Sequence, residues 1–141
     1  MMTQAQGKFI PRPTPETAAF WEACRNHELL IQHCAQCGYY QFYPRIFCTE
    51  CNSRDPEWVK SAGTGEVITF TIVRHPVSPA YADDVPYVIA LIRLDEGPVM
   101  MSNVVQCEPD EVQTGMPVEV VFESRTDEIS IPTFRPLSKI D

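Results

Sequence analysis

Four of the six cysteines fall into two identical pairs, and this spacing is the clearest chemical signal in the chain. Cys34 and Cys37 form one C-x-x-C motif, Cys48 and Cys51 form a second, and ten residues separate the two pairs. A C-x-x-C turn can direct two sulfurs at one point, and two such turns facing each other complete the tetrahedron that Zn²⁺ accepts. The spacing therefore predicts a four-thiolate metal site.

The same cysteine pattern suits a second metal, and it also suits a pair of disulfides. Rubredoxin-like electron carriers hold iron with four thiolates, so an iron electron carrier is an alternative function. We favour zinc, because about 80 residues follow the metal module and a dedicated electron carrier has no evident use for them. A closed four-sulfur site has no open coordination position, so the metal is expected to be structural and not a hydrolytic catalyst. Cys24 and Cys107 are predicted to be small apolar residues.

Short strands are needed to hold the two cysteine turns face to face. Strand-like runs lie at residues 29–33, 39–43 and 56–61, that is before, between and after the cysteine pairs. Gly38, directly after the first pair, suits a turn whose backbone has a positive φ. The small residues that follow, Ser-Ala-Gly-Thr-Gly, have the composition of a junction. We predict a zinc ribbon over residues 29–62.

An extended segment and one short helix are predicted for residues 1–28. Closely spaced prolines favour an extended chain as far as Thr14, which is expected to cap the helix. Over residues 18–28 the apolar side chains, Phe20 and Trp21 among them, recur at helical spacing and form one stripe. Two interpretations stay open, because the stripe either packs on the rest of the chain or contacts a partner protein.

Only strand patterns follow the junction. They span residues 66–73, 87–94, 99–105, 118–123 and 131–134. Five strands without room for a crossover helix predict a small antiparallel barrel, and the OB-fold is the five-stranded barrel of this size. The predicted fold class is therefore mainly β, with an N-terminal helix, a rubredoxin-like zinc ribbon, and a five-stranded antiparallel OB-fold barrel over residues 63–141.

The net charge of −8 is divided unevenly along the chain. Residues 1–62 hold six basic and six acidic side chains, whereas residues 63–141 hold five and thirteen. OB barrels and zinc ribbons commonly bind nucleic acid, so a single-stranded nucleic-acid-binding module is a further alternative function. Such grooves interleave cations with aromatic rings, and an acidic barrel disfavours a phosphate backbone. We predict no nucleic-acid partner.

The chain carries no recognisable targeting or membrane segment. Residues 1–12 lack the apolar run of a signal peptide, and no stretch approaches the roughly 18 apolar residues of a spanning helix. We expect a soluble, cytoplasmic protein without a membrane partner, in a compartment where cysteines stay reduced.

No catalytic motif stands out in the rest of the chain. It has three histidines, and no nucleophile elbow, phosphate loop or metal-binding histidine pair. The loop at residues 74–86 is polar, stiffened by prolines and too long for a tight hairpin. Tyr81 near its middle suits contact with a partner protein. The chain by itself is therefore not expected to be an enzyme.

With these motifs in view, the sequence resembles the OB-fold family with a rubredoxin-like zinc ribbon that accompanies acyl-CoA enzymes, long catalogued as a domain of unknown function. The likeness runs over nearly the whole chain. Its motifs are Phe20-Trp21, Leu29-Leu30, residues 34–38 (CAQCG), Pro44-Arg45, the second cysteine pair, residues 63–67 (GTGEV), 69–71 (TFT), 94–97 (LDEG), 115–120 (GMPVEV) and 134–136 (FRP).

The resemblance implies a small subunit without its own active site, bound to a thiolase-like enzyme and needed for that enzyme's stability or activity. Contexts known for the family include acyltransferases, synthases, and aldolases that cleave CoA thioesters of steroid side chains, some alongside hydratases of the hot-dog fold. The implied small-molecule contact is acyl-CoA. Within this expectation, Phe20, Trp21 and Tyr81 are the predicted partner contacts.

Contact with CoA requires cations for its phosphate groups, even on an acidic protein. The candidates are Arg45 and Arg54 around the second cysteine pair, Arg74 and His75 at the start of the long loop, and Arg93 on a strand. Each of them can equally be an ordinary surface charge or a charge that faces the partner.

Overall fold

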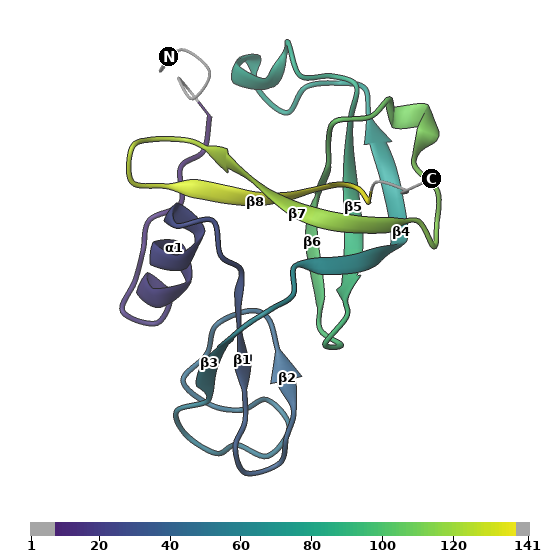
Figure 1. Ribbon diagram of the computed structural model, residues 1–141. Coiled ribbons are helices and arrows are strands. Elements are labelled where there is room, and N and C mark those ends of the chain that lie inside the picture. The colour runs from purple at the N-terminus through teal and green to yellow at the C-terminus, as the bar shows by residue number, and fades with distance from the viewer. Residues whose placement is uncertain (1–7, 138–141) are drawn as a thin grey trace.

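The chain forms a three-stranded ribbon and a closed five-stranded barrel, with one helix beside them (Figure 1). The structure is a computed structural model that describes residues 8–137. The predicted first and last domains extend to residues 1–7 and 138–141, which lie outside the described residues. The elements are α1 (Ala18–Arg25), β1 (Leu30–His33), β2 (Tyr40–Gln41), β3 (Glu57–Lys60), β4 (Thr64–Val73), β5 (Tyr87–Leu94), β6 (Val99–Val104), β7 (Pro117–Ser124) and β8 (Ser130–Pro136), with short 3-10 turns at Pro79–Tyr81 and Pro109–Glu111. The predicted fold class is confirmed.

Two threonines cap the helical turn that leads into α1. The Thr14 Oγ1 accepts a hydrogen bond from the backbone N–H of Thr17 (3.2 Å), and the Thr17 Oγ1 accepts one from the N–H of Thr14 (2.8 Å), which is the reciprocal pattern of a capping box. The helix ends at Arg25, earlier than predicted, because His27 takes a positive φ of 63°. No helix in residues 8–137 is long and apolar enough to cross a membrane.

The ribbon is a small antiparallel sheet with the order β2-β1-β3. Strand β1 pairs with β3 from Leu30 opposite Lys60 to His33 opposite Glu57, and with β2 over only two residues. Apolar side chains of the ribbon, such as Ile31, are buried in one hydrophobic core with the helix and the barrel. A metal module of this size therefore does not rely on its own few apolar residues.

The five strands of the barrel close in the order β4-β5-β6-β8-β7. Four of the five neighbouring pairs are antiparallel, but β6 and β8 meet in parallel at Val104 and Phe134. The barrel is therefore antiparallel as predicted at four of its five seams and parallel at the fifth. The reason is parity, because alternating directions around a ring of five strands must leave at least one pair of neighbours running the same way.

One carboxylate ties the linker between the two sheets to the barrel. Glu96, in the turn between β5 and β6, accepts hydrogen bonds from the Ser61 hydroxyl (2.9 Å) and from the backbone N–H of Ala62 (2.8 Å). Gly63, which follows Ala62, has a φ of 80°. It approaches the barrel so closely that an added Cβ atom would lie 2.7 Å from Val120 Cγ1. The junction that the composition predicted is thus a tightly packed connection.

Candidate metal centre

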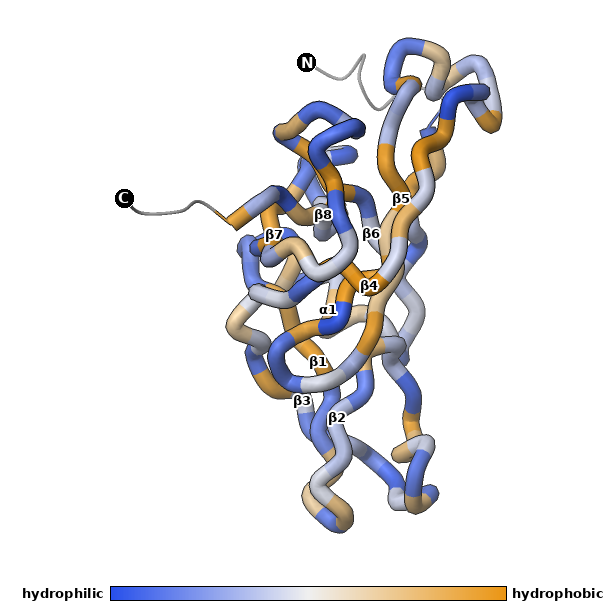
Figure 2. Tube along the Cα trace, turned by 90° about the vertical axis from the view of Figure 1, so that its right-hand side faces the viewer, coloured by the Kyte–Doolittle hydropathy of each residue, from blue (hydrophilic) through white to orange (hydrophobic). Residues whose placement is uncertain are grey.

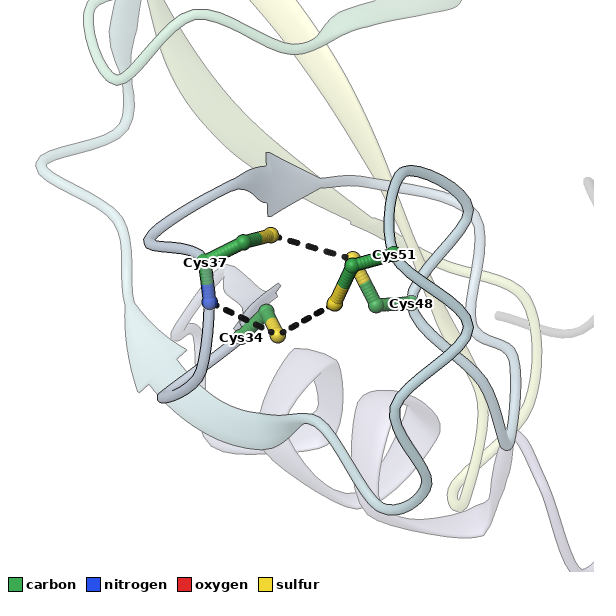
Figure 3. Close-up of side chains that lie close together, drawn as sticks. All are labelled: Cys34, Cys37, Cys48 and Cys51. Atoms are coloured by element: carbon green, nitrogen blue, oxygen red, sulfur yellow. Dashed lines mark hydrogen bonds between the residues drawn. The ribbon is translucent and has the colours of Figure 1, made fainter.

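The four paired cysteines converge on one point of the ribbon (Figure 3). The Sγ atoms of Cys34 and Cys51 lie 3.6 Å apart, as do those of Cys37 and Cys48, and all four lie within 4.8 Å of one another. A disulfide would bring two sulfurs to about 2.05 Å, so these cysteines are free thiols. The structure therefore brings together all four residues that the spacing singled out.

The two cysteine turns have the same hydrogen-bond pattern. In the first, the N–H of Cys34 donates to the carbonyl of Tyr39 (2.9 Å) and the N–H of Gly38 donates back to the carbonyl of Cys34 (2.8 Å). In the second, the N–H of Cys48 donates to the carbonyl of Ser53 (2.8 Å) and the N–H of Asn52 donates back to the carbonyl of Cys48 (2.9 Å). The repeated backbone geometry explains why each turn directs its two sulfurs the same way.

The residue after each pair adopts a left-handed conformation. Gly38 has a φ of 81°, as the sequence suggested, and Asn52 has a φ of 66°. Sequence reasoning missed Asn52, although its place after the second pair and the tolerance of asparagine for this conformation were a usable signal.

Hydrogen bonds to the sulfurs of Cys34 and Cys51 favour the thiolate form that a metal requires. Although a hydrogen bond with the backbone of Tyr39 acts to lower it, the pKa of Cys37 is instead raised to about 12, because burial and the three neighbouring sulfurs together outweigh that bond. The backbone N–H of Cys37 donates to Cys34 Sγ (3.4 Å), and this bond is the main cause that lowers the pKa of Cys34 to about 6. The Ser53 hydroxyl lies 3.0 Å from Cys51 Sγ and lowers the pKa of Cys51. By contrast, burial raises the pKa of Cys24 to about 12, which fits the prediction that Cys24 is an inert core residue.

The sulfur geometry fits a tetrahedral metal ion. With bonds of about 2.3 Å, the edge of a zinc–sulfur tetrahedron is about 3.8 Å, and the two closest sulfur pairs stand at 3.6 Å. Four sulfurs leave no open position, so a bound ion would hold the two turns together and would not activate water. Iron accepts the same four ligands, and the geometry does not separate the two metals.

Two buried glutamines brace the loop that carries the second cysteine pair. Gln32 on β1 donates from Nε2 to the carbonyl of Arg45 (2.9 Å) and accepts at Oε1 from the N–H of Arg45 (3.0 Å). Its Oε1 also accepts from Gln41 Nε2 (2.7 Å), and the Gln41 Oε1 accepts from the N–H of Thr49 (3.0 Å). Sequence reasoning missed both, because a polar residue in a strand is normally taken to face solvent.

The structure does not gather the five predicted CoA contacts into one site. Arg93 pairs with Glu66 near the start of β4 (3.6 Å), whereas Arg74 and His75 follow the end of that strand. Eight residues separate Glu66 from Arg74, which is about 26 Å at the rise of a β-strand. No single phosphate group can therefore contact both Arg74 and Arg93.

Arg45 and Arg54 both lie on the loops of the second cysteine pair. Phe47 and Arg54 form a backbone bridge, and the Arg54 guanidinium stands over the Phe47 ring, 5.1 Å from its centroid. Both arginines are exposed, and neither takes part in an ion pair within residues 8–137. They form one region of the predicted CoA contacts, and the adjacent, exposed Arg74 and His75 form a second.

Burial corrects the predicted partner contact at Phe20. This side chain is only 4% exposed and packs edge to face against Trp21 and Phe42, so it belongs to the core and offers no surface to a partner. Trp21 is half-buried. Tyr81 is half-buried in the long loop, and its hydroxyl accepts a hydrogen bond from the N–H of Phe9 (3.0 Å). Partner contact by Trp21 and Tyr81 stays a prediction.

The histidines have structural surroundings. His33 Nδ1 lies 3.0 Å from Glu57 Oε2 on the neighbouring strand, and the His27 ring stacks on Phe122. Within residues 8–137 no side-chain hydrogen bond joins a histidine ring to a serine or cysteine side chain. A nucleophile activated by a histidine therefore does not occur in the described part of the chain.

Two family models together match most of the chain. The rubredoxin-like zinc ribbon domain of ChsH2 matches residues 21–57, and the C-terminal OB-fold domain of ChsH2 matches residues 58–123. The two matches follow each other in the order of the ribbon and the barrel, and the OB-fold match ends before β8.

Similar proteins include scaffold proteins and subunits of acyl-CoA enzymes. A "DUF35 domain-containing scaffold protein" of Pyrococcus furiosus is 38% identical over 106 residues, which cover 75% of this chain and 77% of the relative. A "probable enoyl-CoA hydratase alpha subunit" of Thermomonospora curvata is 39% identical over 128 residues, which cover 89% of this chain but only 40% of the relative. The chain thus spans less than half the length of that hydratase subunit.

A solved structure called "Ltp2-ChsH2(DUF35) aldolase" contains a similar fold. It superposes with a TM-score of 0.80 at 36% sequence identity and covers 89% of this chain and 98% of the other. With the two matching family models and the scaffold relative, this likeness shows that the chain belongs to the ChsH2/DUF35 family, in which a rubredoxin-like zinc ribbon precedes an OB-fold domain.

Proposed function

We propose that this chain is a non-catalytic scaffold subunit that binds and stabilises, or activates, a thiolase-superfamily enzyme acting on acyl-CoA. The observation that carries the proposal is the match over 98% of a DUF35 chain from an aldolase complex. The absence of a histidine-activated nucleophile from residues 8–137 supports a role that depends on a second protein.

The proposed resident metal is one Zn²⁺ held by Cys34, Cys37, Cys48 and Cys51. Zinc supports such a role because it supplies folding free energy to a module of only three short strands. A ribbon closed by zinc presents a rigid surface without redox chemistry of its own. Iron is the alternative, and metal analysis of the purified protein distinguishes the two.

The proposed reaction of the complex is carbon–carbon bond cleavage or acyl transfer on a CoA thioester. The solved complex is called an aldolase, which supports carbon–carbon bond cleavage, and the relative called an enoyl-CoA hydratase subunit supports a CoA thioester as the substrate. A hot-dog-fold hydratase is a proposed further partner, and the cytoplasm is the proposed compartment. If CoA touches this subunit, Arg45 and Arg54 are one proposed contact region, because they share the loops of the second cysteine pair, and Arg74 with His75 at the start of the long loop is the other.

Nucleic acid is not the proposed ligand. The half of the sequence that forms the barrel has five basic against thirteen acidic side chains, and a phosphate backbone requires the opposite balance. Tight, salt-sensitive binding of a single-stranded oligonucleotide in an electrophoretic shift assay would contradict this view.

Co-expression with the Ltp2-type enzyme of the same organism tests the proposed function. We expect a stable complex on gel filtration, and turnover of a CoA-thioester substrate, by carbon–carbon bond cleavage or acyl transfer, that is lost when this chain is left out. The control is a chain carrying Cys34→Ser, which we expect neither to join the complex nor to restore activity. Full activity from the enzyme alone would contradict a scaffold role.

A further inference from the structure

Strand β5 is apolar on its inner face and, from Ile89 to Leu91, also on its outer face, where the charged Arg93 then ends the apolar run. Its inward side chains, Val88, Ala90, Ile92 and Leu94, are buried in the barrel. The alternate positions point outward, and two of them are Ile89 and Leu91. The outer face of an antiparallel strand is normally polar, and a strand that is apolar throughout is typical of a sheet covered on both sides. Figure 2 shows the hydrophobic residues that recur along β5.

Strand β6 continues this apolar surface. Leu91 lies directly opposite Met101 in the β5–β6 register, so both side chains point outward on the same face, and Val99 lies two residues from Met101. Met101 is 60% exposed and Leu91 is 37% exposed. Two neighbouring strands therefore present large apolar side chains to solvent.

A cleft of about 770 Å³ adjoins these strands and extends the surface toward the long loop. Ile89 and Met101 form its wall on the barrel, Val77 lines it from the long loop, and Phe9 lines it from the N-terminal segment. Val77 is 68% exposed and Phe9 is 74% exposed. We call the surface formed by Phe9, Val77, Ile89, Leu91, Val99 and Met101 the apolar barrel face.

The apolar barrel face is large enough to form the centre of a protein interface. Its six side chains expose on the order of 500 Å² of apolar surface, a size that marks interaction sites on monomers. An interface of standard size buries about 800 Å² per partner. A polar rim around this face would complete such an area.

Three pairs of opposite charges near the face are joined within the chain. Lys8 Nζ lies 2.8 Å from Asp84, Arg125 lies 2.6 Å from Glu123, and Arg93 lies 3.6 Å from Glu66. A rim of neutralised pairs has little attraction for a polyanion or a strongly charged peptide. Charge complementarity therefore favours an occupant whose own contact surface is apolar and uncharged.

Net charge argues against a second copy of this chain as the occupant. The chain carries −8, and pairing two copies would bring like charges together. We infer that the apolar barrel face is the docking surface for the apolar, uncharged face of a different globular protein, which, resting on the function proposed above, is the enzyme subunit.

Two hydrogen bonds hold the face in place before a partner arrives. The backbone N–H of Met101 donates to the hydroxyl of Tyr43 on the ribbon (3.2 Å), and the N–H of Phe9 donates to the hydroxyl of Tyr81 on the long loop (3.0 Å). A surface that is already ordered loses less conformational entropy on binding.

Lysine substitutions on the face test this inference in the full-length, zinc-loaded chain. The variants are Leu91→Lys and Met101→Lys, and the control is Ile46→Lys on the ribbon loop, whose side chain is 41% exposed, close to that of Leu91. The probe is the Ltp2-type subunit of the same organism, titrated calorimetrically. We expect each barrel variant to bind at least about 10-fold more weakly and the double variant about 100-fold more weakly, with little change for the control.

The zinc content and the unfolding temperature of each variant are measured as a control for folding. We expect both to equal those of the unaltered chain, because the substituted side chains point outward. Equal affinity of the unaltered chain and the double variant would overturn the inference and leave the proposed function standing. If the unaltered chain did not bind the Ltp2-type subunit, both the proposed function and the assignment of the enzyme subunit to this face would be overturned. A dimer of this chain on gel filtration that Met101→Lys dissociates would show the second copy to be the occupant, and would overturn the inference as well.

Discussion

Replacing the buried Gln32 by leucine removes the brace of the metal centre without touching a cysteine. In the native chain the Gln32 amide binds both the N–H and the carbonyl of Arg45, at 3.0 and 2.9 Å, and so holds the loop that leads to Cys48. Leucine has a similar size and fills the space, but it offers no hydrogen bond. The substitution therefore isolates the polar contribution of this side chain.

The expected cost follows from the two backbone groups of Arg45 that lose their partner. A buried donor or acceptor without a partner lowers the free energy of unfolding by about 1–3 kcal/mol. For the N–H and the carbonyl of Arg45 together we expect a loss of about 2–4 kcal/mol, because partial access of water to the loop keeps the sum below its upper limit. Gln41 loses its bond to Gln32 but keeps its contact with the carbonyl of Phe47 (3.2 Å). Because metal binding and folding are coupled in structural metal sites, this energy should appear, for the proposed zinc, as an affinity about 30- to 700-fold weaker.

Competition with a chromophoric zinc chelator at pH 7 measures this change. The matched control is Gln36→Leu, the same substitution at an exposed position of the first cysteine turn, where we expect little effect. Circular dichroism should show the barrel strands intact in both variants. A Gln32→Leu chain that binds zinc as tightly as the control would refute the view that the glutamine brace builds the site.

Further substitutions and one modification test other parts of the structure. Gly65→Ala should lower the free energy of unfolding by more than about 2 kcal/mol, because its Cβ would lie 2.3 Å from the carbonyl oxygen of Arg93. Gly38→Ala should cost only about 1 kcal/mol, from the positive φ alone, because nothing lies within 4 Å of the added Cβ; equal urea midpoints for the two variants would contradict this contrast. Cys34→Ser should abolish stoichiometric zinc binding and unfold the ribbon, as measured by metal analysis and hydrogen exchange, and a folded, zinc-free ribbon would speak against structural zinc. Iodoacetamide at pH 8 should leave Cys24 unmodified in the native chain, because burial raises the pKa of its thiol to about 12 and so removes the reactive thiolate. Mass spectrometry should find Cys24 alkylated only after denaturation.

Local patterns in the sequence were enough to predict the metal ligands and most of the strands. Each C-x-x-C motif places its two sulfurs through hydrogen bonds between residues no more than five apart, so the spacing carries the geometry within each turn. The capping role of Thr14 has the same local character, because its partner Thr17 lies three residues away. The strands followed from side-chain alternation, which is also a property of neighbouring residues.

Tertiary structure decided the features that depend on residues far apart in the chain. It buried Phe20 against Phe42, although both interpretations of the helix stripe fit the sequence equally well. It turned Gln32 inward to meet a loop thirteen residues later, and it placed Arg74 and Arg93 toward opposite ends of the same strand pair. It also made one barrel seam parallel, because a closed ring of five strands requires it. Local sequence sets which backbone conformations are favourable, whereas burial and closure depend on which distant segments pack together.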